Sequence, residues 1–245
     1  QEVCAAMVVV VIHIVINGRL QVSLLKIIKS LTLIGVVIIS AAALSQNTEP
    51  EPLPHTTMDY LQGLNNPIYE PFHSSTLDRS LHIYVRLPEG YAETDTQYPV
   101  VYLLDGGATF PMLGGYYNYL RAAGDVPDMI IVGLSYGSND FRTGNMRSTD
   151  YTAPAEDRDH YGGASKFQHF LSDELFPALE AKYRINNKRR ILFGQSIGGQ
   201  FVLYTALTKP DLFWGHLASN PALHRNLPFF LDHPVTNAPS NSKLF

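Results

Sequence analysis

Residues 189–207 read RRILFGQSIGGQFVLYTAL, and this stretch decides the fold that the sequence predicts. A short apolar run at 191–193 is typical of a buried strand. A glycine-rich turn follows, and then an apolar, helix-like pattern that stops at Pro210, because proline cannot extend a helix. A strand, the motif Gly-x-Ser-x-Gly and a helix, in that order, are the context of a nucleophile elbow.

Steric and electrostatic requirements explain the residue types of this turn. Ser196 is expected at the tip of a strained strand-to-helix corner, with Gly194 and Gly198 beside it because side chains there would collide. The helix that starts at Ser196 leaves free backbone N–H groups, and the N–H of Ile197 is a candidate donor to an oxyanion. Two other interpretations are a simple packing turn and a phosphate-binding loop, of which the second lacks the lysine that follows the glycines of a P-loop.

Composition bounds the function classes. The 245 residues suffice for one sizeable α/β domain, and 45% hydrophobic with 16% charged residues is a globular balance. A net charge of −4 gives no reason to expect nucleic acid or an anionic membrane surface as partner. The single cysteine, Cys4, excludes a disulfide within the sequence and a cysteine-based zinc site, and neither a metal nor a cofactor is expected.

The first 54 residues do not resemble part of a globular domain. Residues 1–21 are an upstream extension of uncertain role, whereas 22–45 have the basic start, apolar core and small-x-small end of a signal peptide. Residues 46–54 are polar and proline-rich, which is typical of a linker. Export to the periplasm or the exterior is therefore expected, with a membrane anchor as the alternative, and the membrane is a partner only through this N-terminal segment.

Residues 55–245 alternate strand and helix patterns, which predicts a mostly parallel sheet with helices on both faces and an antiparallel pair of strands at its start. A polar loop is expected over 135–161. The strands are expected at 68–75, 81–87, 98–104, 129–134, 191–193 and 213–218, and the helices at 113–123, 167–183 (with a kink at Pro177) and 201–207.

Several blocks in fixed order resemble the putative-esterase family of α/β-hydrolases, which includes esterase D-like and enterochelin esterase-like enzymes. They are Tyr98-Pro99-Val100 through Leu103-Leu104-Asp105-Gly106, residues 129–133, Arg147 with Asp150-Tyr151-Thr152, residues 162–167, Phe170-Leu171 through Glu174-Leu175, residues 194–199 and Pro210-Asp211-Leu212-Phe213. Together they cover about residues 68–222, and they are more specific to the family than to a substrate.

The resemblance implies a three-layer α/β-hydrolase sandwich and hydrolysis of a small-molecule carboxylic ester through an acyl-enzyme on Ser196. It also implies that an N–H of Gly106 or Gly107 joins Ile197 in an oxyanion hole, and that Arg147 holds the substrate carbonyl. Arg142 is the second candidate for that arginine, and an ordinary ion pair of Arg147 with Asp150 is the alternative role.

The catalytic base and acid are not apparent. On this fold the acid and then the histidine follow the serine, and relatives carry them after two further strands. The candidates that follow the motif each have a structural interpretation: Asp211, His216, His224, Asp232 and His233. The tail at 237–245 reads as irregular, so we expect a C-terminally incomplete hydrolase, impaired in this form, with a non-catalytic pseudoenzyme or binding module as the alternative.

Overall fold

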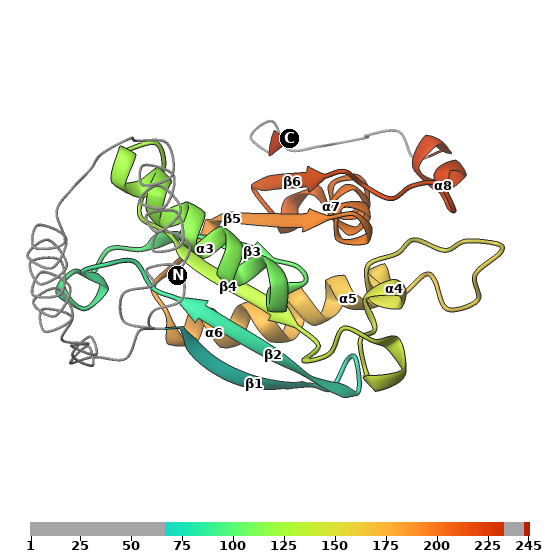
Figure 1. Ribbon diagram of the computed structural model, residues 1–245, viewed down its shortest axis with the longest axis horizontal. Coiled ribbons are helices and arrows are strands. Elements are labelled where there is room, and N and C mark those ends of the chain that lie inside the picture. The colour runs from blue at the N-terminus through green and yellow to red at the C-terminus, as the bar shows by residue number, and fades with distance from the viewer. Residues whose placement is uncertain (1–66, 233–242) are drawn as a thin grey trace, which may run out of the picture. The chain divides into compact units, whose positions relative to one another are not determined.

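The computed structural model describes residues 67–232 and 243–245 (Figure 1). The predicted upstream extension, signal segment and linker, as well as His233, lie outside these residues. Among the helices of the described part, none is long and apolar enough to cross a membrane.

One sheet organises the described residues, in the order β1-β2-β4-β3-β5-β6-β7. Strands β1 and β2 pair antiparallel, β2 pairs antiparallel with β4, and the neighbours from β4 through β7 are parallel. The predicted mostly parallel sheet with an antiparallel start is therefore confirmed. The strands are β1 (Ile68–Ser74), β2 (Arg79–Arg86), β3 (Tyr98–Leu103), β4 (Ile130–Ser135), β5 (Ile185–Gln195), β6 (Gly215–Ser219) and β7 (Lys243–Leu244).

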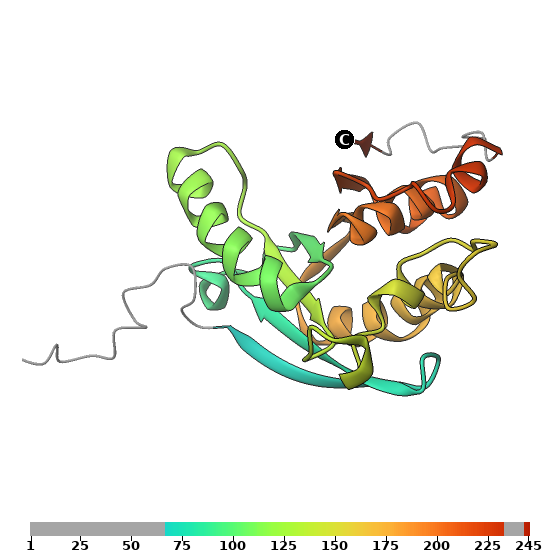
Figure 2. The same ribbon diagram turned by 45° about the vertical axis from the view of Figure 1, so that its right-hand side comes forward.

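Helices cover both faces of the sheet (Figures 1 and 2). The α-helices are α3 (Gly106–Ala123), α4 (Arg147–Asp150), α5 (Ala164–His169), α6 (Phe176–Lys182), α7 (Ile197–Thr208) and α8 (Leu227–Asp232). Short 3-10 turns are η2 (Tyr91–Glu93), η3 (Phe141–Thr143) and η5 (Pro210–Leu212), and η4 (Phe170–Leu175) is a π-helical segment.

Strand β3 shows how the layers form, because successive side chains of a strand point to opposite faces. Val100 and Tyr102 face a core shared with α5, α6 and α7. Val101 and Leu103 face a smaller core, which Phe110 and other residues of α3 complete. The result is the three-layer sandwich that the resemblance implies.

Helix α3 begins at Gly106, seven residues before the predicted start at 113. Its first two turns contain Gly106, Gly107 and Pro111, residue types that locally favour a turn. Tertiary contacts decide otherwise, since the Thr109 hydroxyl donates to the Leu104 carbonyl at 2.8 Å and Phe110 packs against Gly133. The helix ends at Gly124 as expected, with φ of 80°.

The helix predicted over 167–183 is interrupted by η4, immediately before Pro177 near the start of α6. Proline has no N–H to continue the ladder, so the expected irregularity takes the form of a π-helical turn.

Two other expectations were wrong. The middle of the predicted polar loop is core: Tyr151 is fully buried, and its ring lies 5.2 Å from that of Phe167 and 5.8 Å from that of Phe201. The tail is not wholly irregular, because β7 pairs with the outer edge of β6. There the Lys243 N–H donates to the Trp214 carbonyl at 2.9 Å, which satisfies a group of an otherwise unpaired edge.

Candidate active site

Ser196 occupies the turn between β5 and α7, and its backbone is strained. Its φ of 58° and ψ of −115° are unusual for a residue that carries a side chain. A Cβ on Gly194 would lie 2.3 Å from the carbonyl oxygen of Gly198, so that position accepts only glycine. The strand, the turn and the helix are present in the order that the motif predicts.

The backbone of Ser196 is held on three sides. Its N–H donates to the Ser219 carbonyl at 3.0 Å, and its own carbonyl accepts from the N–H groups of Gln200 and Ala222, each at 3.0 Å. By contrast, no described residue forms a hydrogen bond with its hydroxyl, and the residue is partly exposed. Among the described residues, therefore, the hydroxyl has no partner while its main chain is fixed.

Two helix N-termini meet beside this serine. Helix α3 begins directly after Asp105 and α7 directly after Ser196, at the carboxyl ends of the adjacent parallel strands β3 and β5. A Cβ on Gly198 would lie 3.4 Å from Oδ2 of Asp105, which shows how closely the two corners approach. The first N–H groups of a helix have no acceptor within that helix. The predicted donors, Gly106, Gly107 and Ile197, all stand at such positions.

Arg147 reaches this corner from α4, but it does not pair with Asp150. Its Nε and one Nη donate to the two carboxylate oxygens of Asp105, each at 2.8 Å. Burial by itself lowers the pKa of Arg147, but the hydrogen bonds and charge of Asp105 outweigh it and the pKa is raised. The alternative pairing with Asp150 was wrong, whereas a contact of Arg147 with substrate stays a prediction.

Asp150 is buried and belongs to a different group of contacts. It pairs with Arg79 and accepts a hydrogen bond from the Tyr136 hydroxyl at 2.8 Å. Burial raises the pKa of its carboxyl, and the charge of Arg79 acts in the opposite direction. The side chain of the second arginine candidate, Arg142, is 87% exposed, and among the described residues it pairs with Asp140 at 2.9 Å.

None of the candidate bases within the described residues is paired with Ser196. His216 is 1% exposed within β6, and burial lowers its pKa to about 4, partly offset by the backbone of Lys243. His224, Asp211 and Asp232 are exposed. Within the same residues no group of three or more His, Cys, Asp or Glu side chains could hold a metal ion.

Gln200 is a supporting residue that the sequence did not single out. It is buried in α7, where its Oε1 accepts from the Ala153 N–H at 3.2 Å and from Nδ2 of Asn226 at 2.9 Å. Its Nε2 donates to the Ala222 carbonyl. One side chain therefore ties two loops to the helix that follows the serine. The only signal was a polar residue inside an apolar helix.

Known sequences agree with this arrangement. The sequence pattern of the family described as "Putative esterase" matches residues 74–230. The chain is 33% identical over 186 residues to the ferri-bacillibactin esterase BesA of Bacillus subtilis, and the matched residues cover 68% of this chain and 63% of that protein. It is 30% identical over 152 residues to the apo-salmochelin esterase of Escherichia coli, with 58% and 47% covered. The chain thus spans about half to two thirds of the length of these curated relatives.

Solved structures of similar proteins share the fold. The BES protein of Bacillus cereus superposes with a TM-score of 0.62 at 27% identity, covering 76% of this chain and 70% of that one. An IroE-like serine hydrolase of Shewanella oneidensis gives a TM-score of 0.57 at 29% identity, with 69% and 53% covered. With its strand-turn-helix corner at Ser196, the matched pattern and these relatives, the chain belongs to the putative-esterase family of α/β-hydrolases.

Proposed function

We propose that this protein hydrolyses carboxylic esters of small molecules through an acyl-enzyme on Ser196. The observation that carries the proposal is the strained corner, which places the serine beside two helix N-termini. Free N–H groups at such ends stabilise negative charge, and a tetrahedral intermediate carries one on its oxygen.

The steps follow the order of serine acyl transfer. Oγ of Ser196 attacks the ester carbonyl carbon, and the oxyanion accepts hydrogen bonds from the N–H of Ile197 and from that of Gly106 or Gly107. The alcohol leaves with a proton, and water then attacks the acyl-enzyme to release the acid and restore the hydroxyl. Arg147, at the same corner, is proposed to contact the carbonyl group of the substrate.

The substrate class is suggested by the relatives, whose names describe esterases of ferri-bacillibactin and apo-salmochelin. We propose a siderophore-type ester, with a smaller ester of the esterase D type as the other member of this class. We also propose export to the periplasm or the exterior, since residues 22–45 have the pattern of a signal peptide, with membrane anchoring as the alternative.

Activity of this form is proposed to be impaired, because a serine without its base loses several orders of magnitude in rate. Among described residues no histidine is paired with the hydroxyl of Ser196. The same observation favours a second candidate, a non-catalytic module that keeps the scaffold of the fold.

Labelling by a fluorophosphonate–rhodamine probe separates these functions. We expect the wild-type protein to label at Ser196, as mapped by mass spectrometry, and S196A to lose the label completely. Hydrolysis of p-nitrophenyl acetate, measured alongside, should be slow and should disappear in the same variant. Wild-type protein without any label would instead support the non-catalytic module.

A further inference from the structure

The ion pair between Asp105 and Arg147 places a carboxylate close to the proposed oxyanion site. Oδ2 of Asp105 lies 3.4 Å from the place where a Cβ on Gly198 would stand, beside the first turn of α7. A carboxylate at this position opposes the negative charge of an oxyanion nearby, because like charges repel. Its bidentate contact with Arg147 neutralises that carboxylate.

The geometry also fixes which donors of Arg147 remain. A guanidinium has five N–H groups in a rigid plane, and Asp105 uses two of them, one on Nε and one on Nη2. The others stay on the far edge of the same plane. The Arg147 and Asp105 side chains are 28% and 22% exposed, so the pair is largely enclosed but not cut off from solvent.

The backbone of Asp105 makes the arrangement more specific. Its φ of 53° and ψ of 42° put it in the left-handed region, which aspartate and asparagine tolerate better than most residues. It stands directly before the N–H groups of Gly106 and Gly107. Asp105 therefore connects β3 to α3 as the N-cap residue of that helix, and it also binds the guanidinium that comes from α4.

We propose that Asp105 is a positioning residue for the reaction at Ser196, which holds Arg147 beside the N-terminus of α7 and is itself neutralised by that contact. This proposal rests on the proposed function of Ser196. It has a consequence that a merely structural ion pair lacks. Asp105 raises the reaction rate of Ser196 while Arg147 is present and lowers it when Arg147 is absent, because the carboxylate is then an unpaired anion beside the oxyanion.

The test is a double-mutant cycle on the labelling rate of the intact chain. In labelling, a bond forms between Oγ and phosphorus, the phosphorus–fluorine bond breaks, and the hydroxyl proton passes to solvent, while the phosphoryl oxygen gains negative charge. We expect D105N to label about 10-fold more slowly than wild type and R147M about 100-fold more slowly. The double variant D105N/R147M should label about fivefold faster than R147M alone.

The opposite end of α3 offers a matched control. Arg121 pairs there with Asp128 and contacts Glu89 at 2.8 Å. The variants D128N, R121M and their combination remove the same chemical groups from another ion pair, and their labelling rates should stay within twofold of wild type. Circular dichroism melting shows whether each variant is folded.

The outcomes separate the two proposals. Wild-type protein that labels while D105N keeps its full rate, or a double variant no faster than R147M, overturns the positioning role alone. Wild-type protein that does not label overturns the function of Ser196 and the positioning role with it. If D105N does not fold, R147K decides, because lysine keeps the charge but cannot form the two parallel bonds. A fall of about 10-fold then supports the proposal, and an unchanged rate overturns it.

Discussion

The two edges of the parallel strands differ in how they are built. In Figure 1 the arrowheads of β3, β4, β5 and β6 point toward the side of α4 and α8, and this carboxyl edge carries unusual backbone. In the described part of the chain, four residues other than glycine have a positive φ. Three of them, Asp105, Ser196 and Asn220, follow within two residues of the ends of β3, β5 and β6, and the fourth lies in the turn between β1 and β2.

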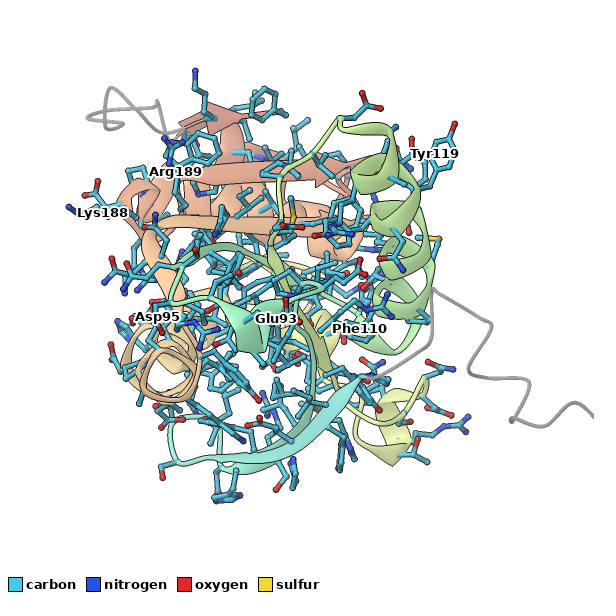
Figure 3. All side chains as sticks on the ribbon, turned by 90° about the vertical axis from the view of Figure 1, so that its left-hand side faces the viewer. Glu93, Asp95, Phe110, Tyr119, Lys188 and Arg189 are labelled. Atoms are coloured by element: carbon cyan, nitrogen blue, oxygen red, sulfur yellow. The ribbon has the colours of Figure 1, made fainter. Side chains whose placement is uncertain are left out.

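The amino edge is held by ordinary contacts. The guanidinium of Arg184 lies 3.7 Å from the ring centre of Tyr91, and that of Arg189 lies 4.4 Å from the ring of Trp214. Arg190 donates from Nε to Glu180 at 2.8 Å. Figure 3 looks onto this edge, where Lys188 and Arg189 extend away from the sheet.

The difference separates stability from reactivity within one sheet. Strained backbone costs of order 1–3 kcal/mol at each position, and it persists only where the surroundings enforce it. Among the described residues, three of the four such positions lie at the edge where helix N-termini and the serine hydroxyl meet. The amino edge carries paired charges and stacked rings, which stabilise the fold without presenting reactive groups.

The largest effect should come from adding one methyl group at the carboxyl edge. In G194A the new Cβ would lie 2.3 Å from a backbone oxygen, which cannot move aside as a side chain does. We expect the free energy of unfolding in urea to fall by about 3 kcal/mol or more. The control is G124A, at a φ of 80° with nothing within 4 Å, which should lose only about 1 kcal/mol. Equal losses would show that the corner can relax.

A smaller effect is expected from pH at the start of β6. His216 has a pKa of about 4 in the folded protein, lowered from 6.5 chiefly by burial, so the unfolded chain binds its proton first as pH falls. The stability that neutral His216 contributes is present above about pH 6.5 and is lost as pH falls toward 4. Between pH 7 and pH 5 the free energy of unfolding should fall by about 2 kcal/mol. Urea unfolding at both pH values checks this: between pH 7 and pH 5 the free energy of unfolding of H216L should fall by about 2 kcal/mol less than that of wild type. The same pH dependence in both proteins would contradict the assignment to His216.

The smallest effect is a gain. In S196G the strained φ of 58° becomes acceptable, because glycine adopts such conformations without steric cost. We expect the free energy of unfolding to rise by about 1 kcal/mol while labelling is lost. S196A keeps its Cβ and hence the strain, so its stability should match that of wild type. A destabilised S196G would mean that the corner carries no strain to release.

The sequence predicted what depends on neighbours in the chain. The turn around Ser196 was predictable because its glycines and its flanking strand and helix are contiguous, and the sheet followed from apolar runs. The partner of Arg147 was not, since Asp105 lies 42 positions away whereas Asp150 is three residues on. The start of α3 and the burial of Tyr151 were also missed, because packing overrides local propensity there.

The contacts of Gln200 have a consequence for how such sites diversify. Two of its three partners are main-chain groups: the Ala153 N–H, which every residue except proline provides, and the Ala222 carbonyl, which every residue provides. The side chains of the two loops that contain Ala153 and Ala222 can therefore be exchanged without loss of these hydrogen bonds. Substitutions in these two loops can therefore fit a substrate of another shape, while the backbone around Ser196 keeps its conformation.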